Sequence, residues 1–151
     1  MIGIIFMKTS NSLRFVTLCA GAFLSVNAFG DDTTVTLKDH KFTVEQANDP
    51  ATQQRGLMFR DSMPADRGMI FNFTDEQPRT FWMKNCRMPL DILYFDKNYK
   101  LVSVQQRVPA CRTEPCPQYP SEGPAQYVLE LNAGLADKLG VKPGDALTVA
   151  K

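Results

Sequence analysis

Alternation between polar and apolar residues marks most of the segments that the sequence predicts to fold. Successive side chains of a β-strand point to opposite faces, so a half-buried strand alternates between the two kinds of residue. Residues 33–37 and 41–45 alternate in this way. Other short segments are rich in aromatic and branched residues or follow a turn, and are also predicted to be strands. They are residues 68–73, 79–83, 90–95, 100–105, 125–131 and 146–149. The turn between 90–95 and 100–105 predicts a hairpin.

Two short helices are predicted between the strands. Asp49 and Pro50 are suited to cap and begin a helix, which should end near Gly56. A second helix is expected to have Asn132 as its cap and to run through Leu139. Both helices are too short to cover a parallel sheet of the Rossmann type, so they argue against that architecture.

Prolines are concentrated in residues 109–124, which contain five of them. Proline disrupts helices and central strands, so this segment is predicted to be a long surface loop. The remaining pattern predicts a mainly β fold, an antiparallel sandwich or a barrel-like (jelly-roll-like) structure with two short helices. Residues 29–151 have the length of one domain with its own core.

The first 28 residues have the organisation of a secretory signal peptide. Lys8 and Arg14 precede an apolar stretch at 15–26, and Ala28 provides a small residue at the expected cleavage position. Either Met1 or Met7 can serve as the start. We therefore expect an exported protein, periplasmic or extracellular, without stable membrane insertion after cleavage, because no later apolar stretch has the length of a membrane span.

Charge and composition narrow the functional classes. Of the 151 residues, 17 are Lys or Arg and 16 are Asp or Glu, giving a net charge of +1, so no basic face for nucleic acid is indicated. A single histidine argues against the common hydrolase triads and zinc enzymes. No cofactor is indicated, and the expected partner is an unknown small molecule or an envelope protein.

A set of short motifs resembles a known family. In chain order they are RGLMFR at 55–60, GMIF at 68–71, FWMKN at 81–85, PLDI at 89–92, YVLE at 127–130, AG at 133–134 and GD at 144–145. Together they resemble the domain of unknown function 192 family (uncharacterised protein family 0127), over about 41–150. The resemblance implies a small, mostly β domain, often exported, with no established activity. Cys86 stands where the family pattern leads us to expect Thr, and a cysteine pair within 109–124 is expected in only part of the family.

Three cysteines follow the signal segment. Cys111 and Cys116 lie close together in the proline-rich segment, and in an exported protein they are predicted to form a disulfide rather than a redox pair. Cys86 is then the free thiol. It is interpreted as a small buried residue, with a nucleophile or a metal ligand as alternatives.

The candidate site is a polar and aromatic group around residues 81–85. Asp91 and Glu130 lie within apolar strand segments, where a carboxylate needs a partner. One interpretation is a ligand-binding pocket, and the other is a network of structural ion pairs. The residues proposed to bind ligand are Arg55, Trp82, Lys84, Asn85, Asp91 and Glu130.

The favoured function is therefore an exported ligand-binding or accessory module. One alternative is a glycan-active enzyme that uses Asp91 and Glu130 as acid and base, which requires both carboxyls in one cleft. Another is a soft-metal carrier that holds Cu(I) with Met83, Cys86 and Met88. Core packing is the simpler explanation for the methionines.

Overall fold

The computed structural model describes residues 31–150, so the predicted signal peptide at 1–28 lies outside the described residues. The strands are β1 (Asp32–Leu37), β2 (His40–Ala47), β3 (Arg67–Trp82), β4 (Leu90–Phe95), β5 (Leu101–Val108), β6 (Gln118–Asn132) and β7 (Leu147–Val149). The helices are α1 (Pro50–Arg55) and α2 (Leu135–Leu139). Within the described range, neither helix has the length and apolar character needed to cross a membrane.

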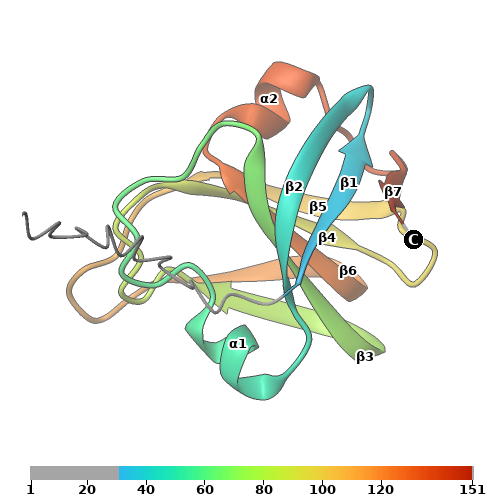
Figure 1. Cartoon of the computed structure of the whole chain (residues 1–151). Coiled ribbons are helices and arrows are strands. Elements are labelled where there is room, and N and C mark those ends of the chain that lie inside the picture. Colours follow the sequence, from blue (N-terminus) through green and yellow to red (C-terminus); the bar gives the residue numbers. More distant parts are fainter. Residues whose placement is uncertain (1–30, 151) are drawn as a thin grey trace, which may run out of the picture.

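The strands form one seven-stranded sheet in the order β5-β4-β6-β3-β2-β1-β7. All neighbours are antiparallel except β2 and β3, which are parallel. The sheet curls into a half-barrel (Figure 1). The predicted mainly β class with two short helices is thus confirmed, but a single curled sheet is present where a sandwich was the first expectation.

The two edges of the sheet meet at one end of the half-barrel. The N–H of Leu101 donates to the carbonyl of Asp145 at 2.8 Å, and the carbonyl of Leu101 accepts a hydrogen bond from the N–H of Gly144, also at 2.8 Å. Leu147 donates to the carbonyl of Tyr99 at 2.9 Å. These bonds satisfy backbone groups that an open edge would leave to solvent, and they fix the curvature of the sheet.

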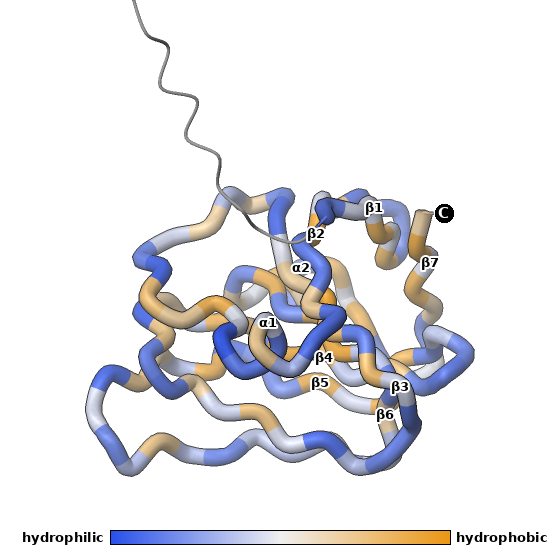
Figure 2. The backbone as a smooth tube through the Cα atoms, turned by 60° about the horizontal axis from the view of Figure 1, so that its bottom comes forward, coloured by the Kyte–Doolittle hydropathy of each residue, from blue (hydrophilic) through white to orange (hydrophobic). Residues whose placement is uncertain are grey.

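Strand β4, next to the edge strand β5, is buried on both faces. All six of its residues are buried, and alternate side chains enter two different apolar clusters. Leu93 and Phe95 enter the cluster that α2 also contacts, and Leu90, Ile92 and Tyr94 enter the other. In Figure 2, hydrophobic positions recur along β4 and β5, whereas the outlying loops are mostly hydrophilic. The sheet must therefore be covered on both sides.

The two strands predicted at 68–73 and 79–83 are parts of one long strand, β3. Its pairing with β6 is interrupted by register shifts between Asn72 and Gln77 and between Pro78 and Thr80. These irregularities explain why the sequence pattern breaks in the middle while the strand continues. The predicted hairpin of β4 and β5 is confirmed.

The predicted loop at 109–124 is shorter than expected, because β6 already begins at Gln118. Pro120 and Pro124 lie within β6, opposite Thr80 and Pro78 of β3. β4 pairs with β6 only from Tyr127 onward, so the earlier part of β6 is hydrogen-bonded to a strand on one side alone. Proline has no backbone N–H to donate, and this is tolerated in the first part of β6 because no second neighbouring strand requires that hydrogen bond.

The first helix matches its prediction, and the second ends at Leu139 as predicted but begins later than expected, at Leu135. Asp49 caps α1 and accepts the N–H groups of Ala51 and Thr52. Asn132, the predicted cap of α2, is instead the last residue of β6. The residue before α2 is Gly134, whose φ of 88° is in the left-handed region and which offers no side-chain cap.

The missing cap of α2 is supplied from β4 by Asp91, which is fully buried. Its Oδ2 accepts the N–H of Ala136 in the first turn of α2 at 2.8 Å. Its Oδ1 accepts the N–H of Arg107 at 2.7 Å, where β5 carries an extra residue opposite β4 and φ is 51°. Asp91 therefore joins a helix end and a strand bulge to the centre of the sheet.

Replacing Asp91 by Ala should destabilise the fold strongly. The change removes two charge-assisted hydrogen bonds and leaves two backbone N–H groups without this partner, at a cost of about 3 kcal/mol. Asp91→Asn keeps one acceptor and should cost less. Urea unfolding of both variants measures these losses, and equal stability of Asp91→Ala and the wild type would contradict this role.

Candidate functional site

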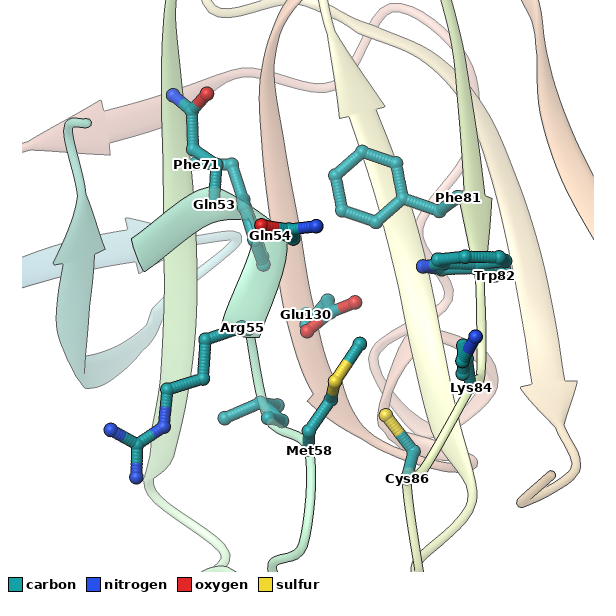
Figure 3. Close-up of a pocket in the computed structure, with 12 residues that line it drawn as sticks. Gln53, Gln54, Arg55, Met58, Phe71, Phe81, Trp82, Lys84, Cys86 and Glu130 are labelled. Carbon is teal, nitrogen blue, oxygen red and sulfur yellow. The ribbon is translucent and has the colours of Figure 1, made fainter. Parts of the chain in front are cut away.

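A pocket lies between two walls on the face of the sheet opposite α2. One wall is α1 with the turn that follows it, and the other is the end of β3 with residues 83–86 (Figure 3). The empty volume is about 280 Å³, part of it open to solvent. The lining residues are Gln53, Gln54, Arg55, Gly56, Leu57, Met58, Phe71, Phe81, Trp82, Lys84, Cys86 and Glu130.

The two walls are joined through a pair of unusual backbone conformations. Phe59 and Asn85 both have positive φ, 65° and 58°, which is uncommon for residues other than glycine. The N–H of Phe59 donates to the carbonyl of Asn85 at 2.8 Å. The side-chain amide of Asn85 also lies 3.9 Å from the sulfur of Met58. Such conformations persist only where the surroundings support them, and here the hydrogen bond between the two residues links the two walls of the pocket.

Glu130 lies at the floor of the pocket, on β6. Its side chain enters the space between the two walls (Figure 3), and only 3% of the residue is exposed. Its Oε2 is buried and has no hydrogen-bond partner among the described residues. Burial raises the pKa of Glu130 to about 8, although the nearby charge of Arg60 opposes this rise. The carboxyl is therefore mainly protonated at neutral pH and can donate a hydrogen bond.

The charge of Arg60 opposes the rise in the pKa of Glu130, and the Arg60 guanidinium is itself held by Glu45. Both ends of its guanidinium bond the Glu45 carboxylate on β2, one of them at 2.8 Å. A bidentate pair of this kind fixes the guanidinium in place. Glu130, at the floor of the pocket, therefore retains a carboxyl oxygen, Oε2, without a hydrogen bond from the described residues.

Cys86 lines the same pocket but is a poor nucleophile. Burial raises the pKa of its thiol to about 12, and the charge of Glu130 adds to the effect. Because the thiolate is the reactive form, a raised pKa suppresses reactivity at neutral pH. The interpretation of Cys86 as a small buried residue is the one that this environment favours.

The rim of the pocket is aromatic and charged. Trp82 is 44% exposed, and the ammonium of Lys84 lies 5.1 Å from the centre of its ring, within the range of a cation–π contact. Lys84 also forms an ion pair with Glu114 at 2.5 Å. Glu114 lies in the loop closed by the disulfide between Cys111 and Cys116, so the predicted disulfide is present and brings that loop to the rim.

Most of the proposed ligand-binding residues lie together. Arg55, Trp82, Lys84 and Glu130 line the pocket, and Asn85 lines a shallow extension of it that shares its rim. The side chain of Arg55 runs away from Glu130 in Figure 3, so its charge belongs to the rim rather than the floor. Asp91 is the exception, because it belongs to the structural link described above.

Asp91 and Glu130 occupy opposite faces of the sheet. In the pairing of β4 with β6, Glu130 is opposite Ile92, and Asp91 is opposite Leu131. Paired residues share a face and neighbours alternate, so the two carboxyls point away from each other. The expectation that they form an acid–base pair in one cleft is therefore wrong. The sequence alone could not show that the two carboxyls lie on opposite faces, because this depends on the register between β4 and β6.

The residues proposed to carry Cu(I) lie in the apolar core. Met83, Cys86 and Met88 are each at most 6% exposed and belong to the same cluster as Phe71 and Tyr94. This placement favours the packing explanation for the methionines. No group of three or more His, Cys, Asp or Glu residues suited to a metal is found in residues 31–150.

Sequence reasoning missed several residues of the pocket, among them Gln54 and Met58, whose side chains point into the space between the two walls in Figure 3. The polar end of α1, with consecutive glutamines, was the available signal. Gln53 is the less available of the two, because its amide donates to the carbonyls of Ala47 and Asn72. It ties α1 to the sheet.

The raised pKa of Glu130 predicts a pH dependence of stability. Its pKa rises from 4.5 to about 8 on folding, so the folded state holds the proton more tightly between these values. The free energy of unfolding should fall as pH rises through this window, by at most about 1.4 kcal/mol per pH unit, and level off above it. Glu130→Gln should flatten this slope in urea unfolding. Glu122→Gln, which changes an exposed residue of the same strand, should retain it, and a slope that survives Glu130→Gln would contradict the assignment.

Comparison with known proteins places the chain among uncharacterised relatives. No curated protein matches it. It is similar to a protein from Sinorhizobium meliloti 1021 described as a "putative transcription regulator", with 36% identity, a TM-score of 0.74, and 80% of this chain and 95% of that one covered. It is also similar to a protein of unknown function from Novosphingobium aromaticivorans DSM 12444, with 34% identity, a TM-score of 0.71, and coverage of 92% and 99%. The family model DUF192, described as "Uncharacterized ACR", matches residues 33–149. With most of its length matched, the chain belongs to the DUF192 family.

Proposed function

We propose that this protein is an exported module that binds a small molecule in the pocket above Glu130. The observation that carries the proposal is the unpartnered Oε2 of Glu130 at the pocket floor. A buried polar atom without a hydrogen bond is costly, and a ligand that bonds it recovers part of that cost. The exposed ring of Trp82 supplies a flat apolar surface on the wall formed by the end of β3 (Figure 3).

The composition of the pocket supports recognition more than reaction. Apolar side chains such as Leu57, Phe71 and Phe81 line it together with polar groups of α1, the rim and the floor, and polar groups that converge in this way fix the orientation of a ligand. Among the described lining residues, Glu130 is the only carboxyl and Cys86 carries a thiol of raised pKa. These groups suit donation of one hydrogen bond to a ligand better than acid–base chemistry, for which a second titrating group is needed.

Export is part of the proposal. The order of basic, apolar and small residues in 1–28 and the disulfide of Cys111 and Cys116 both fit an oxidising compartment. The net charge near zero does not favour nucleic acid as the partner.

Ligand binding can be tested through Trp82, which is the only tryptophan of the chain. Its indole N–H gives one signal in a nitrogen–proton NMR spectrum, so a fragment collection can be screened on that signal alone. We expect a subset of fragments to shift it, and Glu130→Leu to weaken their binding at least about tenfold, which corresponds to the loss of one hydrogen bond to a buried acid.

Two variants control this experiment. Glu76→Gln removes an exposed ion pair with Lys97 and should leave the fragment affinities unchanged. Lys84→Met should keep the melting temperature within a few degrees, because the Lys84 side chain is partly exposed and its ion pair is of the weak surface type. A screen in which no fragment shifts the indole signal, or in which Glu130→Leu binds as well as the wild type, would refute the proposal.

Export makes a separate prediction about mass. After expression of the full chain with secretion, the intact mass should correspond to a protein that begins at Phe29. It should also be lower by two hydrogens, for the bond between Cys111 and Cys116. A mass that includes residues 1–28 would contradict cleavage, and a mass without the loss of two hydrogens would contradict the disulfide.

A further inference from the structure

The ion pair between Lys84 and Glu114 suggests what kind of ligand the pocket takes, if it binds one as proposed above. Glu114 is 60% exposed and Lys84 is 36% exposed, so both groups remain in contact with solvent. Ion pairs of this kind contribute little free energy, typically below about 1 kcal/mol. The carboxylate of Glu114 is therefore a partner that another anion can replace at little cost.

Lys84 is placed where a bound ligand would reach it. It lines both the pocket and its shallow extension, and its ammonium lies against the ring of Trp82. The floor offers Glu130, and the apolar side chains of Phe81 and Met58 line the same pocket (Figure 3). A ligand that satisfies all of these groups carries an anionic end, an apolar body and a hydrogen-bond acceptor.

We propose that the pocket binds small organic anions with an apolar or aromatic body, whose carboxylate takes the place of Glu114 on Lys84. The body of the ligand packs against Trp82 and the apolar walls, and an acceptor atom reaches Glu130. Glu114 is then a competitor that belongs to the protein itself.

A cationic ligand fits the same surroundings poorly. The face of Trp82 that would attract a cation already has the ammonium of Lys84 5.1 Å from its centre. An amine that approaches this face of Trp82 would meet the positive charge of Lys84, whereas an anion would be attracted to it.

The disulfide keeps Glu114 close to Lys84 as a weak but constant competitor. Cys111 and Cys116 close a loop of few residues around Glu114, and Lys84 pairs through its backbone with Cys111. The carboxylate is thus held near Lys84 at a high effective concentration, as in other intramolecular binding. A ligand must displace it, so its affinity for the wild-type protein is lower than for a protein without that charge.

The test uses acid and amide pairs of the same shape that also carry a ketone as the acceptor for Glu130, 4-acetylbenzoate with 4-acetylbenzamide and 5-oxohexanoate with 5-oxohexanamide, on the indole signal of Trp82. We expect the acids to bind and the amides to bind at least several-fold more weakly. Glu114→Gln should tighten the acids by up to about fivefold, the equivalent of one exposed ion pair, and Lys84→Gln should weaken them. Glu76→Gln, which breaks the ion pair with Lys97, should change neither the affinity for the acids nor the affinity for the amides.

Each other outcome overturns the assignment. If amides or other neutral fragments bind as well as the acids, the pocket is a binding site but the ligand is not an anion. If Glu114→Gln leaves the affinity for acids unchanged or lowers it, Glu114 does not compete for Lys84. If no compound in the wider fragment screen moves the indole signal, the binding function and the ligand class are both wrong.

Discussion

The burial of β4 and of the adjoining part of β6 on both faces is the constraint from which the rest of the structure follows. A polar side chain in these strands cannot reach solvent, so it must find a partner or lose its charge. Asp91 and Glu130 lie one register position apart and meet this demand in opposite ways. Asp91 accepts two backbone N–H groups and links elements of the fold, whereas Glu130 has an oxygen without a partner and a raised pKa.

The pocket exists because two chain segments pass over the Glu130 face without filling it. α1 is started by the cap at Asp49 and lies against the sheet through Gln53. The end of β3 brings Trp82 and Lys84 across from it. The hydrogen bond from Phe59 to Asn85 sets the distance between the two segments, and both residues adopt positive φ to make it. Backbone strain at the join is balanced by the packing on either side.

Local patterns in the sequence predicted the strands and α1 well, since alternation and capping depend on neighbours in the chain. The proline-rich segment was only partly predictable, because Pro120 and Pro124 are acceptable in β6 only where β4 is not its neighbour. Asn132 has the side chain of a cap, yet α2 is capped from β4. The face of Asp91 and the pairing of Lys84 with Glu114 depend on register and on distant segments, which no local pattern contains.

The polar groups of the pocket differ in how much solvent they retain, and this difference divides their roles. Glu130 is buried from solvent, so a hydrogen bond to it is strong and the loss of that hydrogen bond is costly. Lys84 is half-solvated and already paired, so exchanging one anion for another there involves only a small difference in free energy. The floor therefore governs whether a ligand is held at all, while the rim discriminates among ligands by charge. The disulfide-closed loop, through the carboxylate of Glu114, affects the discrimination by charge at the rim. Retention of the ligand at the floor depends on Glu130, which the sheet positions.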